Sequence, residues 1–227
     1  MTLRSIEIAF DILAFLFALS VHEAAHAWTA DRLGDPTARL LGRVTLNPWP
    51  HLDLVGTILM PLFGILSGFP ILGWAKPTPV NVSRLRSPRR DDLLVSAAGP
   101  LSNLLVALAA VAALLAIRLS SSEGAAVVGY LAGRSGPHLS GSLLAPIALL
   151  LYRFLFINVL LGVFNLIPIP PLDGSHILGN LLPLRLQYAY AEVGRFGFLI
   201  LMGLLWLGVP YMLFSPVFAV FNLLLRI

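Results

Sequence analysis

Two histidines and a glutamate stand close together near the start of the chain, in the run His22-Glu23-Ala24-Ala25-His26. In an α-helix, residues four apart lie one above the other on the same face. His22 and His26 can therefore offer two imidazole nitrogens to one metal ion, and Glu23, one step round the helix, can reach the open side of that ion. Two histidine ligands beside a glutamate that takes a proton from water are the arrangement used in zinc-dependent hydrolysis of peptide bonds.

The surroundings of these residues distinguish the match from a chance one. A five-residue match arises by chance in many proteins, and a single histidine in an apolar helix is more often a hydrogen-bonded core residue. Here the three ionisable groups lie in an apolar run from Ile6 to Ala30, which is long enough to cross a bilayer. Each such group costs about 2.5 kcal/mol or more in hydrocarbon. A shared cation compensates all three, so the sequence predicts a metal site inside the membrane.

The composition indicates an integral membrane protein with little mass outside the bilayer. Of its 227 residues, 58% are hydrophobic and 11% are charged, whereas a soluble domain has about 25% charged residues. The net charge of +4 comes from arginines beside apolar runs, which is a topology signal and argues against a nucleic-acid partner. The chain has no cysteine, so its metal ligands must come from five histidines and eleven acidic residues. Residues 1–20 lack the small-residue cleavage site of a signal peptide.

The apolar runs predict an all-α, polytopic membrane fold with about four to six transmembrane helices. Four runs are long enough to be spans, and they are Ile6–Ala30, Leu93–Leu119, Leu143–Ile167 and Phe196–Leu225. We expect one domain over residues 1–227, with its core at 6–180 and apolar C-terminal helices at 181–227. A further apolar segment at 54–74 is rich in glycine and proline and has basic residues on both sides. It would be re-entrant if both of its flanks are cytoplasmic.

The arginines also predict on which side of the membrane the site lies. Arg32, Arg39 and Arg43 follow the first span, and positive residues are enriched in cytoplasmic loops. From that end of the span, His26 lies about 7 Å and His22 about 14 Å back along the helix. We therefore expect a multi-pass protein of the cell membrane whose active site is nearer the cytoplasmic face.

A catalytic zinc site needs a third protein ligand and one open position. The candidates are Asp173, Asp53, His51, His176 and His138. Counting crossings puts Asp173 on the same side as the two histidines and His138 on the opposite side. Asp173 follows a proline-rich helix break, and it could alternatively cap the next helix. His51 and Asp53 suit an interfacial loop and remain open as ligands to the metal or its water, while His176 is expected to be a packing residue.

A second motif makes the pattern specific. Downstream lies N-x-x-P-x-P-x-x-D-G, formed by Asn165, Pro168, Pro170, Asp173 and Gly174. Together with the His22–His26 motif, it makes the chain resemble the site-2 protease family of intramembrane zinc metalloproteases. The stretch around Gly99, Pro100 and Asn103 is similar to the core helix that lies between the two motifs in that family.

The resemblance implies a role for each site residue. In this family, residues matching His22, His26 and Asp173 bind one catalytic Zn²⁺, and the one matching Glu23 activates water. The position of Asn165 implies contact with the substrate or the oxyanion. With no PDZ-like insertion, the chain is similar to minimal members of the family. It departs from their pattern in having no span before the motif helix and in its apolar segment at 54–74.

These observations predict an intramembrane zinc metalloprotease. It would hydrolyse peptide bonds within or near transmembrane helices of protein substrates in the lipid bilayer, as in regulated intramembrane proteolysis. The alternative is a zinc-binding membrane protein without proteolysis, such as a transporter. A transporter needs ionisable groups at several depths, whereas here they cluster near one face. A protein that has lost proteolysis would be expected to lose Glu23, which is present.

Overall fold

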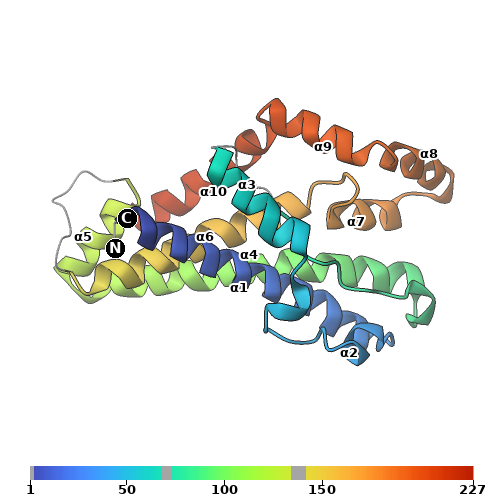
Figure 1. Cartoon of the computed structure of the whole chain (residues 1–227), viewed down its shortest axis with the longest axis horizontal. Coiled ribbons are helices and arrows are strands. Elements are labelled where there is room, and N and C mark those ends of the chain that lie inside the picture. Colours follow the sequence, from blue (N-terminus) through green and yellow to red (C-terminus); the bar gives the residue numbers. More distant parts are fainter. Residues whose placement is uncertain (1–2, 68–72, 134–141, 227) are drawn as a thin grey trace.

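The computed structural model describes residues 3–67, 73–133 and 142–226, and every regular element within them is helical. The three longest helices are α1 (Leu3–Arg32), α4 (Pro88–Ser120) and α6 (Leu144–Asn165). They run lengthwise beside one another and form the body of the molecule (Figure 1). Each corresponds to one of the long apolar runs of the sequence, because a helix satisfies its own backbone hydrogen bonds where no water is present.

Helix α4 lies at the centre of the bundle and packs against both α1 and α6. The largest hydrophobic core lies between α4, α6 and the short helix α5 (Ser122–Leu131), with Leu114, Val128 and Leu155 among its fully buried members. Between α1 and α6, the small residues Ala14 and Ala18 of α1 cluster with Ile157 of α6, and such small residues allow two helices to approach closely in lipid.

Three described helices are long and apolar enough to cross a membrane, namely Ser5–Arg32, Pro88–Ser120 and Leu144–Asn165. A fourth crossing is available if α8 (Leu184–Gly194) and α9 (Gly197–Trp206) form one broken span, since they meet at 67°. The last helix, α10 (Val209–Arg226), contains a shorter apolar stretch. The all-α, polytopic fold predicted from the sequence is confirmed, with three or four candidate spans where four to six were predicted. The run Phe196–Leu225, expected to be one span, is divided between α9 and α10.

The segment 54–74 contains two short helical pieces. These are η2 (Leu54–Leu59), with π-helical hydrogen bonding, and α3 (Met60–Ser67). With six and eight residues at about 1.5 Å each, they are together too short for a hydrocarbon core of about 30 Å. The following residues, 68–72, lie outside the described part of the chain, so a re-entrant course remains a prediction.

The remaining short elements gather at the end of the bundle where α1 finishes. They include α2 (Thr37–Leu40), η1 (Trp49–His51), η3 (Val82–Arg84) and α7 (Asp173–Leu181). Both α2 and α7 lie at the end of the molecule opposite to the chain termini (Figure 1). An extended segment, residues 73–81, leads into η3 and passes beside the His22–His26 turn of α1.

Candidate metal centre

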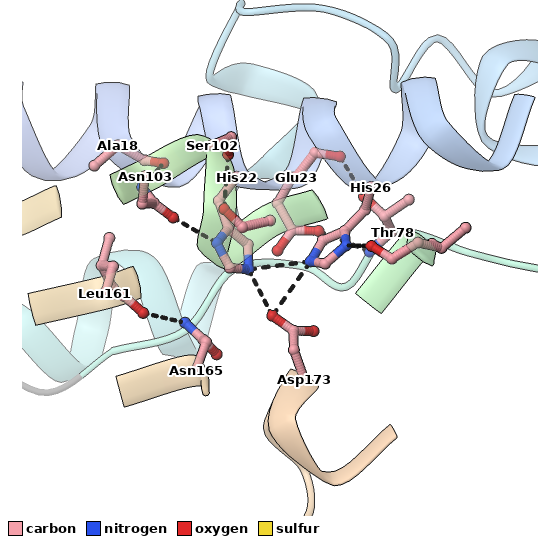
Figure 2. A network of polar contacts seen from close by, with 12 residues as sticks. Ala18, His22, Glu23, His26, Thr78, Ser102, Asn103, Leu161, Asn165 and Asp173 are labelled. Carbon is pink, nitrogen blue, oxygen red and sulfur yellow. Dashed lines mark hydrogen bonds and ion pairs between the residues drawn. The ribbon is translucent and has the colours of Figure 1, made fainter. Parts of the chain in front are cut away.

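Three predicted ligands meet where α1 faces the start of α7. Asp173 Oδ2 lies 3.0 Å from His22 Nε2 and 3.4 Å from His26 Nε2, and the two Nε2 atoms are 3.1 Å apart. Figure 2 shows Asp173 pointing from α7 into the gap between the two rings. In the part of the chain that the structure describes, this is the only group of three such side chains able to hold one metal ion.

The hydrogen-bond partners of the two Nδ1 atoms determine which nitrogen of each ring carries a proton. His22 Nδ1 is 2.6 Å from Asn103 Oδ1, and His26 Nδ1 is 2.7 Å from the backbone oxygen of Val95. Both partners are acceptors, so each ring carries a proton on Nδ1, and in a neutral ring the free lone pair is then at Nε2.

With both rings neutral, three lone pairs therefore converge on one point. The carboxylate atom involved, Asp173 Oδ2, is buried and has no hydrogen-bond partner. Buried acceptors so close together repel one another unless a cation lies among them. Two neutral imidazoles and one carboxylate are the donor set of a catalytic zinc site. The residues present thus fit a zinc ion, on chemistry as well as on geometry.

A glycine keeps the space beside the histidines open. Gly99 on α4 faces the two rings, and a Cβ atom added there would lie 2.6 Å from His26 Cε1 and 2.7 Å from His22 Cε1, and closer still to His26 Nε2. No side chain fits in that gap. The glycine therefore provides the cradle in which the two imidazoles meet.

Asp173 is held by the way α7 begins. The proline-rich stretch 168–171 ends the α6 segment, and Asp173 opens the next helix. Gly174 packs so tightly that an added Cβ would lie 2.5 Å from the Ile167 carbonyl oxygen. The start of α4 is hydrogen-bonded to the C-terminal end of α7. Arg89 donates from Nε to Asn180 O and from Nη2 to Leu182 O, both at 2.6 Å.

A second contact joins the same two helices. Asp92 accepts a hydrogen bond of 2.6 Å from Asn180 Nδ2 and lies 3.6 Å from His176 Nδ1. The Asp92 carboxylate raises the pKa of His176 above its ordinary value, outweighing the effect of burial. His176 was expected to be a packing residue; it pairs with Asp92 and takes no part in the three-residue cluster.

Glu23 lies beside the cluster and is held by the extended segment. Its Oε2 accepts a hydrogen bond of 2.9 Å from the backbone N–H of Thr78, whose hydroxyl donates to the Glu23 backbone oxygen at 3.1 Å. Sequence reasoning did not identify Thr78, because nothing in its local sequence reveals a contact with a residue 55 positions earlier.

Asn165 lies at the end of α6, in the view of Figure 2 near Asp173. Its side-chain amide donates to the Leu161 carbonyl oxygen at 3.0 Å, one turn back on its own helix. One amide N–H remains for another acceptor. The role expected for Asn165 stays a prediction.

The other candidate ligands are placed elsewhere. His51 is fully buried, with Nε2 2.9 Å from the Thr45 carbonyl oxygen. Asp53 caps η2 by accepting from the backbone N–H groups of Val55 and Gly56 at 3.1 and 2.7 Å. Neither belongs to the three-residue cluster, and His138 lies outside the described residues.

Comparison with known proteins agrees with the geometry. The family model described as peptidase family M50, the site-2 protease family, matches residues 10–208. The chain belongs to peptidase family M50. The resemblance inferred from the two motifs is thereby confirmed, and the protein is a zinc metalloprotease with Zn²⁺ as its cofactor.

Relatives of this M50 chain carry names that describe them, provisionally, as zinc metalloproteases. YwhC of Bacillus subtilis (strain 168) is 35% identical over 193 residues, which cover 83% of this chain and 76% of YwhC. Rip2 of Mycobacterium tuberculosis (strain H37Rv) is 33% identical over 213 residues, covering 90% of this chain and 72% of Rip2. Rip2 of Mycolicibacterium smegmatis is 32% identical, covering 86% and 65%. No solved structure matches the chain significantly.

Proposed function

We propose that this M50 protease hydrolyses peptide bonds within or next to the transmembrane helices of membrane-protein substrates, as in regulated intramembrane proteolysis. One observation carries the proposal: His22, His26 and Glu23 lie on α1, a helix long and apolar enough to span the bilayer, and Asp173 reaches the two histidines there. A site at that depth is accessible to substrates that themselves lie in the membrane.

We assign the chemical steps to four kinds of group. His22, His26 and Asp173 hold the zinc ion. Zinc bound there supplies Lewis-acid chemistry, which polarises a carbonyl and makes water more acidic. Glu23, oriented by Thr78, accepts the proton of the attacking water and passes it to the leaving amine. Asn165 uses its remaining amide N–H to stabilise the developing oxyanion.

The substrate must change conformation before it can react. A transmembrane helix hides its carbonyl groups in hydrogen bonds to the fourth residue along, and it excludes water. The scissile region must therefore unwind beside the zinc ligands. The proline-rich break at 168–171, next to Asp173, and the helical pieces at 54–67 are the parts of this chain suited to line that space.

The site is proposed to lie nearer the cytoplasmic face. Arg32 ends α1 and Arg39 and Arg43 follow it, at the end of the helix that carries the histidines, and positive charge favours the cytoplasm. Because the chain has no cysteine, single-cysteine variants test this directly. In oriented membranes, a maleimide that cannot cross the bilayer should label Leu40→Cys on α2 from the cytoplasmic side and Ser122→Cys from the opposite side. The reverse labelling would overturn the orientation.

Substitution of Glu23 tests the proposed reaction. With purified protein and a single-span substrate in proteoliposomes, Glu23→Gln should slow cleavage about 100- to 10,000-fold, the range expected for loss of a general base, while zinc content stays unchanged. Glu7→Gln is the matched control, since Glu7 lies on the same helix but pairs with Arg153 at 3.7 Å. Undiminished cleavage by the zinc-loaded Glu23 variant would refute its role. Cleavage of soluble peptides alone would refute the membrane substrate.

A zinc transporter is the other class of protein to be tested. It would require metal-binding groups at successive depths. Among the described residues, the acids at the other end of α1, Glu7 and Asp11, face Arg153 at 3.7 and 3.4 Å and form no second metal group. Zinc flux into proteoliposomes without any peptide cleavage would favour the transporter.

A further inference from the structure

Two fully buried asparagines stand in line behind His22. Asn103 comes from α4 and Asn158 from the middle of the apolar helix α6. Figure 2 shows Asn103 directed at the His22 ring from the side opposite Asp173. An amide without partners costs several kcal/mol at membrane depth. Their hydrogen bonds therefore need to be complete, and this fixes the direction of each bond.

The hydrogen bonds that run from Asn158 through Asn103 to His22 start at a backbone carbonyl group. Asn158 Nδ2 lies 2.8 Å from the Phe154 carbonyl oxygen, which can only accept. The NH₂ group of Asn158 must face that oxygen, so its own Oδ1 faces Asn103. The orientation of the Asn158 amide is therefore fixed without any assumption about Asn103.

The same logic fixes Asn103. Its Nδ2 lies 3.0 Å from the Ala18 carbonyl oxygen and 2.8 Å from Asn158 Oδ1. Both are acceptors, so both N–H bonds of Asn103 are used. The remaining atom, Asn103 Oδ1, can only accept, and it lies 2.6 Å from His22 Nδ1.

We propose that Asn103 and Asn158 are positioning residues that select the tautomer of His22. Asn103 Oδ1 forces the His22 proton onto Nδ1, which leaves the Nε2 lone pair aimed at the position between His26 and Asp173. His26 needs no such asparagine pair, because the Val95 carbonyl oxygen accepts a hydrogen bond from its Nδ1–H directly. The inference rests on the proposed role of His22 as a zinc ligand and is independent of whether the substrate is a membrane helix.

The packing explains why two asparagines are required. His22, Asn103 and Asn158 belong to three different helices, and α1, α4 and α6 all pack against one another. A single asparagine held only by the Ala18 carbonyl would keep one N–H without an acceptor in an apolar interior. Asn158 supplies that acceptor, so the orientation of Asn103 is fixed from two helices.

The first experiment measures the tautomer itself. In metal-free protein labelled with ¹⁵N in its histidines, at a pH where the imidazoles are neutral, NMR should show His22 as the Nδ1–H form, with the signal assigned by its loss in His22→Ala. In Asn103→Leu, which has a similar volume and no acceptor, the signal should move toward a mixture of tautomers. This readout requires neither zinc nor substrate, so it separates failure of the inference from failure of the proposed function.

Zinc affinity is the second readout, measured by competition with a chelator. Loss of a hydrogen bond to a metal-bound histidine costs 10- to 100-fold in affinity, which we expect for Asn103→Leu. Asn158→Leu should cost a few-fold, since the Ala18 carbonyl still orients Asn103. Asn222→Leu is the matched control, because Asn222 accepts from Tyr152 Oη at 3.2 Å in another part of the bundle. It should bind zinc as the unsubstituted protein does.

Two results would overturn the proposal. One is an unchanged His22 tautomer together with unchanged zinc affinity in Asn103→Leu. The other is an equal loss of affinity in Asn222→Leu, which would show a general effect of removing polar groups from the bundle. If Asn103→Leu does not fold, Asn158→Leu carries the test. An unchanged zinc affinity and an unchanged His22 tautomer in that variant then count against the proposed role of the two asparagines.

Discussion

Thr78 holds Glu23 at two points, with its backbone N–H on the carboxylate at 2.9 Å and its hydroxyl on the Glu23 backbone oxygen at 3.1 Å. The first contact occupies Oε2 and leaves Oε1 for water. The second ties the extended segment to the helix that carries the two histidines proposed as zinc ligands. The proposed base is thus held in place by a segment distant in sequence.

Removing the Thr78 hydroxyl should therefore impair catalysis without affecting zinc. A hydrogen bond of this kind contributes about 0.5–1.5 kcal/mol, so Thr78→Val should lower kcat about two- to tenfold, with KM and zinc content unchanged. Steady-state kinetics in proteoliposomes would measure this. Thr78→Ser keeps the hydroxyl and should restore kcat. A Val variant as active as the Ser variant would contradict the prediction.

Asp173 should be necessary for zinc binding. A catalytic zinc site normally has three protein ligands, and loss of the only carboxylate in the cluster leaves two neutral imidazoles. Metal analysis of purified Asp173→Ala should give zinc well below one ion per chain. Asp53→Ala should retain full occupancy, since Asp53 caps η2. Full zinc occupancy in Asp173→Ala together with low occupancy in Asp53→Ala would instead make Asp53 the ligand.

The gap beside the two imidazoles should not tolerate a methyl group. Gly99→Ala puts a Cβ 2.7 Å from His22 Cε1, although alanine is favoured over glycine within a helix by about 1 kcal/mol. We expect loss of stoichiometric zinc binding with helix content retained, checked by metal analysis and circular dichroism. Gly203→Ala on α9 is the control, because its Cβ would meet nothing within 4 Å. Full zinc occupancy in Gly99→Ala would show that the rings can move aside.

Asp35 should make the protein sensitive to acid. It is fully buried just after α1 and accepts hydrogen bonds from Thr37 and, at 2.6 Å, from the backbone N–H of Asn81. Burial alone would raise the pKa of its carboxyl, but these hydrogen bonds outweigh burial and hold the pKa below its ordinary value. The resulting stability is complete above the unfolded pKa of about 3.9 and is lost as the pH falls through the lower folded value.

Asp35→Asn should remove that acid dependence and also weaken the protein at neutral pH. Its amide places an NH₂ group where a carboxylate oxygen now accepts, and a buried group without a partner costs about 1–3 kcal/mol. Thermal unfolding in detergent from neutral pH down to about pH 3 would measure both effects. Identical pH profiles for the variant and the unsubstituted protein would contradict the assignment of the acid-sensitive group to Asp35.

The sequence made some parts of this site predictable and hid others. His22, Glu23 and His26 follow from helical periodicity, and Asp173 from a second motif beside a proline break. Thr78 and Asp35 act through partners far away in sequence, which only tertiary packing brings close.

Asn158 did leave a signal in the sequence. An amide in the middle of an apolar helix needs a partner, so it could have been recognised as functional, although its partner Asn103 could not have been named from this argument. The course of the segment 54–74 was harder to predict, because glycine and proline allow several backbone conformations there.

The hydrogen bonds from Arg89 of α4 to the end of α7 have a consequence for biosynthesis. Residues 22 and 26 enter the membrane early, but the carboxylate that joins them belongs to residue 173, and α7 is fastened only after Asn180 and Leu182 reach Arg89. At 5–20 residues per second, on the order of ten seconds of translation separate these events. With the proposed ligand set, a ribosome-bound, half-made chain lacks one zinc ligand, and hydrolytic capacity arises only when the later helices have been inserted.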